Sequence, residues 1–202
     1  MLDSLLIATT NPGKRREFAE LLVRLPVTLV WPDERGLRIE VEETGDTFEE
    51  NARLKALAYA QASGLWALAD DSGLEVDALG GAPGVHTARY AGPEASDAQR
   101  YGLLLARMRE VPSNRRGARF RCAIVVAAPD GRSWATEGAC EGMIAQAPSG
   151  AGGFGYDPVF YMPEWGCTMA DLPAEIKNRV SHRARAAQAM RRLLLDEIIP
   201  HG

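Results

Sequence analysis

The sequence predicts an α/β protein with an elongated, mixed β-sheet flanked by helices. Three observations predict it: a strand–turn–helix–strand opening, a well-capped helix before residue 64, and two long strand-like runs in the second half. The chain has 202 residues, of which 46% are hydrophobic and 25% are charged, enough for one sizeable core. We expect a single domain over residues 1–202 in two lobes with a central cleft, because polar motifs occur in both halves.

The opening has the pattern of a βαβ unit. "SLLIAT" at residues 4–9 is a short apolar run bounded by a turn, which indicates a buried strand. The turn "TNPGK" follows, and then "REFAELLVRL" places apolar residues at helical spacing. "VTLVW" at residues 27–31 is the second strand, so a parallel pair is expected.

The clearest helix is "TGDTFEENARLKALAYAQASG". Thr47 and Glu50 form the pattern of a capping box, and Gly64 is a natural C-terminal stop. Asn51 and Lys55 lie four residues apart and therefore share a face of this helix.

The remaining elements follow in order. "LWALA" and "LEVDAL" are expected as strands on either side of Asp70 and Asp71, which would stand at a strand end followed by a glycine turn. A long loop leads to the helix "SDAQRYGLLLARMREV", with Ser96 and Gln99 as its capping box. Two long strands joined at "PDG" predict a hairpin. An irregular "PSGAGGFGYDP", a short strand "VFYM" and a helix starting near "SHR" complete the chain.

Composition excludes several classes of protein. The net charge of −4 disfavours a partner that is a nucleic-acid polymer. Cys122, Cys140 and Cys167 form no CxxC pair, which argues against a disulfide framework and a structural zinc site. The apolar run at the N-terminus is too short for a signal peptide or a membrane span. We expect a cytoplasmic protein with no membrane partner.

Acidic residues form the first group of candidate functional residues. Asp70 and Asp71 are flanked by apolar residues, and crowded carboxylates near a core need a cation. Mg²⁺ suits them, and one acid could also take a proton from water. The alternative is a solvated turn at a strand end. Glu42 and Glu43 precede the capped helix and are either metal ligands or surface acids.

A second candidate is the turn "TTNPGK". Backbone N–H groups at a helix start, together with hydroxyls and a lysine, make an anion site. The turn lacks the glycine pattern of a Walker P-loop, and it could instead be a polar turn capped by Asn11. Its residues are Thr9, Thr10, Asn11, Pro12, Gly13 and Lys14.

The last candidates lie toward the C-terminus. "GAGGFGYD" at residues 150–157 lets a backbone approach a ligand closely, and Phe154 and Tyr156 offer faces on which a base can stack. A flexible turn with core aromatic residues is the alternative. Lys177 and the "SHR" of residues 181–183 could donate hydrogen bonds to a purine, or could belong to a solvated basic helix face.

The order of these motifs resembles the inosine/xanthosine triphosphate pyrophosphatase family, the Ham1-like pyrophosphatases of noncanonical purine nucleotides. The resemblance runs from "ATTNPGK" through "EETGDTFEENARLKA", "ALADDSGLEVDALGGAPGVHTARYAG" and "GGFGYDPVF" to "K…SHR". It implies an elongated α/β fold, a homodimer, and Mg²⁺-dependent hydrolysis of ITP, dITP or XTP to the monophosphate and pyrophosphate. One departure is Thr10, which stands where many members have glycine.

The resemblance also implies roles for residues. The segment from Thr9 to Lys14 would hold the phosphates. Glu42 and Asp71 would bind magnesium, and Asp71 would also be the catalytic proton acceptor; whether Asp70 shares the metal stays open. Substrate contacts to the nucleoside and base would come from Ser72, Phe154, Gly155, Tyr156, Asp157, Lys177, His182 and Arg183.

Three other functions remain as alternatives. A protein that binds or senses purine nucleotides without hydrolysing them would use the same motifs. A nucleic-acid-binding protein would use the basic C-terminal helix, and its binding would depend on salt. A phosphatase would release orthophosphate instead of pyrophosphate.

Overall fold

The computed structural model describes residues 2–199 and has a mixed α/β fold, as predicted. Its seven strands have the order β2-β1-β3-β4-β5-β6-β7. β1 pairs in parallel with β2 and β3, whereas β6 pairs antiparallel with β5 and β7. The strands are β1 Ser4–Ile7, β2 Thr28–Val30, β3 Trp66–Val76, β4 Gly117–Ala127, β5 Ser133–Ile144, β6 Phe160–Met162 and β7 Cys167–Thr168.

The chain separates into two compact units. The first contains residues 2–71, 122–138 and 182–199, and the second contains residues 72–121 and 139–181. The helices of the first unit are α1 Pro12–Leu21, α2 Phe48–Ser63 and α5 His182–Leu193, and those of the second are α3 Asp97–Arg107 and α4 Ala174–Val180. Across residues 2–199, no helix has the length and apolar composition that crossing a bilayer requires.

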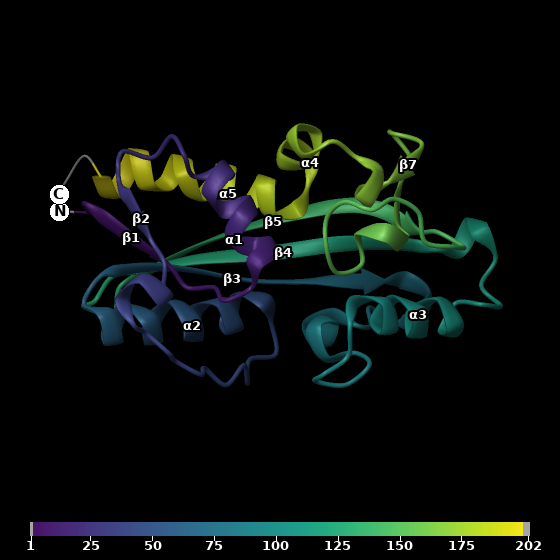
Figure 1. Cartoon of the computed structure of the whole chain (residues 1–202), viewed down its shortest axis with the longest axis horizontal. Helices are drawn as coiled ribbons and strands as arrows, with labels where there is room; N and C mark the ends of the chain where they lie inside the picture. Colours follow the sequence, from purple (N-terminus) through teal and green to yellow (C-terminus); the bar gives the residue numbers. More distant parts are fainter. Residues whose placement is uncertain (1, 200–202) are drawn as a thin grey trace. The chain divides into compact units, whose positions relative to one another are not determined.

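The first unit has apolar packing on both faces of its strands. In β1, Leu5 and Ile7 pack with residues of α1 and α5, and Leu6 packs with the small residues of α2. Figure 1 shows α2 on one side of these strands and α1 and α5 on the other. The side chains of β1 alternate between two core clusters with the two-residue period of a strand, so both faces of β1 are covered by helices.

Local signals set the ends of the helices in the first unit. α1 begins at Pro12, earlier than its apolar spacing alone suggests, because Asn11 Oδ1 accepts a hydrogen bond from Lys14 N at 3.0 Å. α2 has the predicted capping box between Thr47 and Glu50. It ends at Gly64, whose φ of +67° is the left-handed conformation that glycine adopts without strain.

The structure contradicts one prediction about the strands. Asp70 and Asp71 do not end a strand: they lie within β3, which runs without a turn for 11 residues. The expected strand end at "DDSG" is therefore wrong. Charged residues are tolerated at this buried position because side chains from other elements pair with them, as described below.

The second unit has its own hydrophobic core. Leu104 of α3 and Met108, the residue after its end, pack with residues of β4, β5 and β6. Within that cluster the rings of Phe120 and Phe160 have centroids 4.5 Å apart.

β4 and β5 are sheet neighbours joined by a short turn at residues 128–132, so the predicted hairpin is confirmed. α3 has the predicted capping box of Ser96 and Gln99, whereas α4 and β7 were not predicted.

Candidate active site

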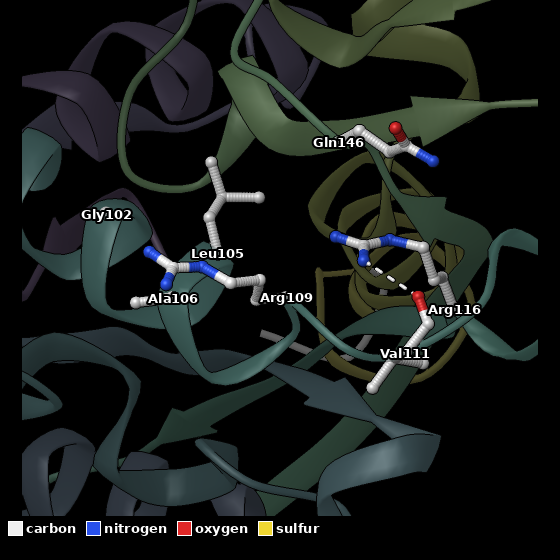
Figure 2. A pocket seen from close by; sticks show the side chains of 7 residues that line it. All are labelled: Gly102, Leu105, Ala106, Arg109, Val111, Arg116 and Gln146. Atoms are coloured by element: carbon white, nitrogen blue, oxygen red, sulfur yellow. Dashed lines mark hydrogen bonds between the residues drawn. The ribbon is translucent and has the colours of Figure 1, made fainter.

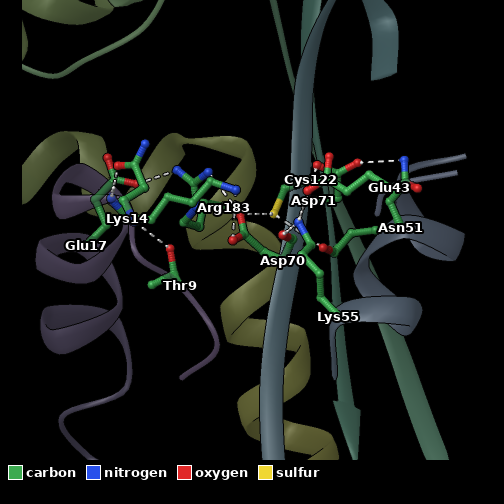
Figure 3. A network of polar contacts seen from close by, with 12 residues as sticks. Thr9, Lys14, Glu17, Glu43, Asn51, Lys55, Asp70, Asp71, Cys122 and Arg183 are labelled. Carbon is green, nitrogen blue, oxygen red and sulfur yellow. Dashed lines mark hydrogen bonds and ion pairs between the residues drawn. The ribbon is translucent and has the colours of Figure 1, made fainter. Parts of the chain in front are cut away.

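Asp70 and Asp71 are adjacent in β3 but face opposite sides of the strand (Figure 3). Neighbouring side chains of a strand alternate between its faces. Asp70 is on the face of Leu68, which packs with α1 and α5, and Asp71 is on the face of Ala69, which packs with α2. Each carboxylate therefore has its own environment and its own cations.

The carboxylate of Asp70 is buried in an ion network on the side of α1 and α5. Its Oδ1 lies 3.0 Å from Lys14 Nζ. Its Oδ2 accepts hydrogen bonds from Arg183 Nε at 3.1 Å and from Arg183 Nη2 at 3.0 Å. Arg183 Nη1 donates to Glu17 Oε2 at 2.6 Å. Asp70 and Arg183 are each 2% exposed, so these charge-assisted hydrogen bonds join α1, β3 and α5 out of contact with water.

This network fixes the protonation states of its members. Burial raises the pKa of Asp70, but the charges of Lys14 and Arg183, with that of Lys55, outweigh burial and hold the pKa well below its usual range. Asp70 is therefore ionised at neutral pH. Burial also raises the pKa of the Cys122 thiol, and the nearby Asp70 charge adds to this effect. Cys122 Sγ lies 3.8 Å from Asp70 Oδ2, and as a neutral thiol it is a poor nucleophile.

Asp71 has weaker contacts on the α2 side. Asn51 Nδ2 donates to Asp71 Oδ2 at 3.3 Å, and Lys55 Nζ lies 3.7 Å from Asp71 Oδ1. Asn51 and Lys55 come from one face of α2, as their spacing predicts. Asp71 is 7% exposed, so it is buried as well.

The two acids consequently differ in proton affinity. Burial raises the pKa of Asp71. The positive charges of Lys55 and Lys14 offset part of this rise, and the negative charges of Glu43 and Asp70 add to it. The net pKa lies above its usual value, whereas that of Asp70 lies below it. A carboxylate of raised proton affinity is suited to accept a proton from water.

Lys55 connects Asp71 to the acidic segment before α2. Its Nζ donates to Glu43 Oε1 at 2.9 Å and to the backbone oxygen of Asp70 at 2.7 Å. Burial lowers the pKa of Lys55, but the charges of Asp71, Asp70 and Glu43 together outweigh burial and raise it. Lys55 is therefore an ammonium with donors aimed at both segments.

The acidic segment is anchored to α2 through Gly45 and Asn51. Asn51 Oδ1 accepts from Gly45 N at 2.8 Å, and Asn51 Nδ2 donates to Gly45 O at 3.3 Å. A Cβ at Gly45 would lie 2.6 Å from the Cβ of Glu50, so the close approach requires glycine. In this conformation Glu43 points to Lys55, and Glu42 is exposed.

We tested whether these acids could hold a magnesium ion. In the described range 2–199, no group of three or more histidine, cysteine and acidic side chains has the arrangement of a metal site. Mg²⁺, however, is commonly bound by one or two carboxylates together with substrate phosphates. Asp71 and Glu43 both approach the ammonium of Lys55, which places two oxygen donors around one cation. The donor set therefore fits a magnesium ion that completes its coordination with substrate and water.

The "TTNPGK" turn joins β1 to α1. Thr9 Oγ1 accepts from Asn11 N at 3.2 Å, and Asn11 caps the helix as described above. Thr10, Asn11 and Pro12 are exposed, while Gly13 is buried. The Lys14 side chain turns away from the turn to pair with Asp70, so the turn and the acid pair are linked through this residue.

The glycine-rich loop of the second unit is built around Asp157. Its Oδ2 accepts hydrogen bonds from Phe154 N at 2.8 Å and from Lys177 Nζ at 2.6 Å. Lys177 Nζ also lies 5.0 Å from the centre of the Phe154 ring. A Cβ at Gly153, whose φ is +73°, would collide with Asp157 Oδ2. The structure thus brings Lys177 next to Phe154 and Asp157, although it comes from a separate sequence motif.

The other predicted contacts are distributed between the units. Ser72 is half-buried in β3. Tyr156 is buried in the second unit, and burial raises the pKa of its hydroxyl. His182 and Arg183 begin α5 in the first unit, and both are buried. The guanidinium of Arg183 contacts Glu17 and Asp70, so the structure places this side chain at the acid pair, and its role at the base stays a prediction.

A pocket in the second unit is lined by none of the predicted residues, and Figure 2 shows the side chains in its wall. Its volume is about 450 Å³. Arg116 in its wall donates to the backbone oxygens of Ile144, Met108, Val111 and Ala145, so this guanidinium stabilises loops. The lining residues are Gly102, Leu105, Ala106, Arg109, Val111, Arg116 and Gln146.

Sequence reasoning missed Glu17, and it named Glu42 and Glu43 together as metal ligands or surface acids before the resemblance singled out Glu42. Glu17 is three residues after Lys14 and therefore on the same helix face, a signal that could have identified it. Glu43 is adjacent to Glu42, and residue type alone does not distinguish the two. The hydrogen bond from Lys55 Nζ to Glu43 Oε1 shows which of the two points to Lys55.

The chain was compared with known protein families and sequences. A model of the Ham1 family matches residues 5–193. The dITP/XTP pyrophosphatase of Geobacter sulfurreducens is 51% identical over 185 residues, which cover 92% of this chain and 93% of that protein. The dITP/XTP pyrophosphatase of Thermus thermophilus is 54% identical over 185 residues, covering 92% of this chain and 88% of that protein.

Solved structures give the same relationship. A HAM1 protein from Coxiella burnetii has a TM-score of 0.88 and 40% identity, and the match covers 97% of this chain and 100% of that one. The Ham1 protein of Staphylococcus aureus has a TM-score of 0.86 and 40% identity, with 96% and 99% covered. Sequence and fold agree over nearly the whole length, and the chain belongs to the Ham1 family.

Proposed function

We propose that this chain is a dITP/XTP pyrophosphatase, which hydrolyses noncanonical purine nucleoside triphosphates such as dITP, ITP and XTP to the monophosphate and pyrophosphate. In this role it removes deaminated purines from the nucleotide pool. The observation that carries the proposal is the difference between the two adjacent acids of β3. Asp70 is held ionised by cations, whereas Asp71 has a raised proton affinity. The relatives named dITP/XTP pyrophosphatase support the substrate class.

Cations of the first unit offset the negative charge of the triphosphate. Lys14 and Lys55 are the two ammonium groups nearest the acid pair, and the turn from Thr9 to Lys14 lies at the start of a helix. Helix N-termini and lysines both favour bound phosphate. Arg183 and Glu17 keep Asp70 in place, and Asp70 in turn holds the ammonium of Lys14.

Hydrolysis proceeds by attack of water on the α-phosphorus. The new P–O bond forms as the bond to the bridging oxygen of the β-phosphate breaks, and pyrophosphate leaves. Asp71 accepts the proton from the attacking water, for which its raised pKa is suited. Positioning and charge stabilisation supply most of the acceleration in such reactions.

Magnesium is the proposed cofactor. Asp71 would hold it together with an acid of the segment before α2, either the family-predicted Glu42 or the Glu43 that contacts Lys55. When bound, the ion neutralises charge that develops on the phosphoryl oxygens.

The base is read by donors that match its 6-keto oxygen. Lys177, His182 and Arg183 are the proposed donors, and an adenine would meet them with its own amino donor. An unmatched buried polar group costs about 1–3 kcal/mol. Phe154, Gly155, Tyr156 and Asp157 would line the nucleoside, and Ser72 would contact the substrate.

A panel of triphosphates tests the function. Wild-type protein is incubated with dITP, ITP, XTP, GTP and ATP, with and without Mg²⁺, and pyrophosphate and orthophosphate are measured separately. We expect pyrophosphate from the first three with Mg²⁺. Release of orthophosphate would indicate a phosphatase, and binding without either product would indicate a sensing protein.

The variant Asp71→Asn tests the proposed proton transfer. This variant keeps the shape of the side chain and can still accept from Asn51, but it cannot take a proton. We expect turnover to fall by about 10²–10⁴-fold with the circular dichroism spectrum unchanged. Turnover close to that of the wild type would exclude Asp71 as the proton acceptor.

We also propose that the protein acts in the cytoplasm, where its substrates form, and that it is a homodimer. Both proposals come from the resemblance described above. The dimer is tested below at the scale of the whole molecule.

A further inference from the structure

Three consecutive residues of the glycine-rich loop are held by three different acceptors. Phe154 N donates within the loop, to Asp157. Gly155 N donates to Asp97 Oδ2 at 2.7 Å, and Tyr156 Oη donates to the backbone oxygen of Thr87 at 3.1 Å. The last two contacts span 58 and 69 residues of sequence, so distant segments of the second unit fix the loop.

Asp97 reaches the loop from the first turn of α3. Its Oδ1 accepts from Arg100 Nη1 at 2.9 Å, and its Oδ2 accepts from Gly155 N. The helix is capped separately by Ser96 and Gln99. An acidic residue in a first turn also stabilises a helix through its dipole. This helix role does not explain the second oxygen of Asp97, which accepts from Gly155 N in another segment.

Gly155 is the residue of the loop that most needs such a contact. Its φ is +64°, and glycine in a loop can leave the left-handed region at little cost. Gly153 before it also has a positive φ, so the chain on that side offers little resistance to rotation. A carboxylate that accepts from Gly155 N restrains the peptide between Phe154 and Gly155 through a charge-assisted hydrogen bond.

This restraint bears on the groups that contact the nucleoside. Phe154 is bonded through that peptide, and its ring lies beside Lys177 Nζ. Tyr156, on the other side, is 2% exposed and cannot compensate by moving. We propose that Asp97 is a positioning residue for substrate binding, which preorganises the glycine-rich loop by accepting from Gly155 N. This rests on the proposed function of the loop as the nucleoside contact.

Three variants separate positioning from helix stability. Asp97→Ala removes the acceptor, Asp97→Asn retains one oxygen acceptor in place, and Ser96→Ala weakens the cap of α3 but leaves Asp97 intact. We expect Asp97→Ala to raise KM for dITP about tenfold with kcat changed by less than about twofold, because a loop that must be ordered on binding weakens affinity. Asp97→Asn should restore most of the affinity. Ser96→Ala should lower the melting temperature and leave KM unchanged.

Hydrogen exchange of the free protein supplies a readout that needs no substrate. We expect the amide of Gly155 to exchange faster in Asp97→Ala than in the wild type or in Ser96→Ala. Unchanged exchange, or an unchanged KM in an active Asp97→Ala enzyme, overturns the inference, and so does an equal rise in KM for Ser96→Ala. If the wild type hydrolyses no purine triphosphate, the proposed function fails first, and the positioning role in substrate binding fails with it.

Discussion

Glu42 and Glu43 are adjacent, yet the structure gives them different surroundings. Glu43 accepts a hydrogen bond from Lys55 Nζ and its charge raises the pKa of Asp71, whereas Glu42 is exposed. The family motif assigns the metal to Glu42, and the contacts favour Glu43. An exposed carboxylate is free of the desolvation penalty, so Glu42 is accessible to a hydrated ion.

Single glutamine variants of these residues separate the two assignments. If Glu42 is the ligand, Glu42→Gln should raise the Mg²⁺ concentration for half-maximal rate by about 10–100-fold. Glu43→Gln should then change that concentration by less than about threefold and act mainly on kcat, through the freed Lys55. The rate is measured against Mg²⁺ at saturating dITP. A larger Mg²⁺ shift in Glu43→Gln would transfer the ligand role to Glu43.

At this scale, residue type predicted the candidates but not their partners. Asp71, Lys14 and Arg183 were identifiable because acids beside an apolar strand and cations in polar motifs are chemically unusual. The pairing of Arg183 with Asp70 could not be identified from the sequence, because 113 residues separate them. Pairs of this kind depend on tertiary contacts, and no local spacing rule contains them.

Among the elements, α1, β3 and α5 are joined by the network of Asp70. Its lowered folded-state pKa means that ionised Asp70 contributes stability at pH values above about 4, where the unfolded carboxyl also loses its proton. That contribution is lost as the pH falls through the lowered pKa. Removing the charge also leaves Arg183 and Lys14 short of a buried partner.

Asp70→Asn should therefore lower the free energy of unfolding by about 3–5 kcal/mol at pH 7, and the difference from the wild type should shrink below pH 4. Urea unfolding at pH 7 and pH 3 in metal-free buffer measures it. The matched control is Asp130→Asn, which breaks an exposed ion pair with Arg132 and should have little effect at either pH. A difference that grows on acidification would contradict the assignment.

Elements with local signals were predicted well from sequence. The ends of α2 and α3 follow from capping boxes, whose donors and acceptors lie within four residues. The continuity of β3 was missed because the groups that make two acids tolerable in a strand come from α1, α2 and α5. The short α4 and β7 have too few residues for a periodic pattern to appear.

For the whole molecule, the sequence predicted the fold class and two lobes, but it did not predict where the chain divides. Each unit is assembled from segments that are far apart in the chain. β3, β4 and β5 each contribute residues to both units, so no composition shift or linker marks a boundary. A division within continuous strands leaves no trace in local composition.

The proposed homodimer is a prediction at this scale. Sedimentation equilibrium should give a mass about twice the 21.9 kDa of one chain at micromolar concentration. The same sample is assayed for pyrophosphate release, so that an inactive aggregate is not taken for the dimer. A monomer mass at full activity would exclude the homodimer as the working form.

The opposite orientation of Asp70 and Asp71 also restricts which insertions and deletions the coding sequence tolerates. Inserting or deleting one codon between Trp66 and Ala69 would reverse which side each acid faces, because side chains alternate along a strand. Asp71 would then meet Arg183, and Asp70 would meet Asn51. Substitutions in this segment keep both orientations, whereas insertions and deletions must fall in the connecting loops.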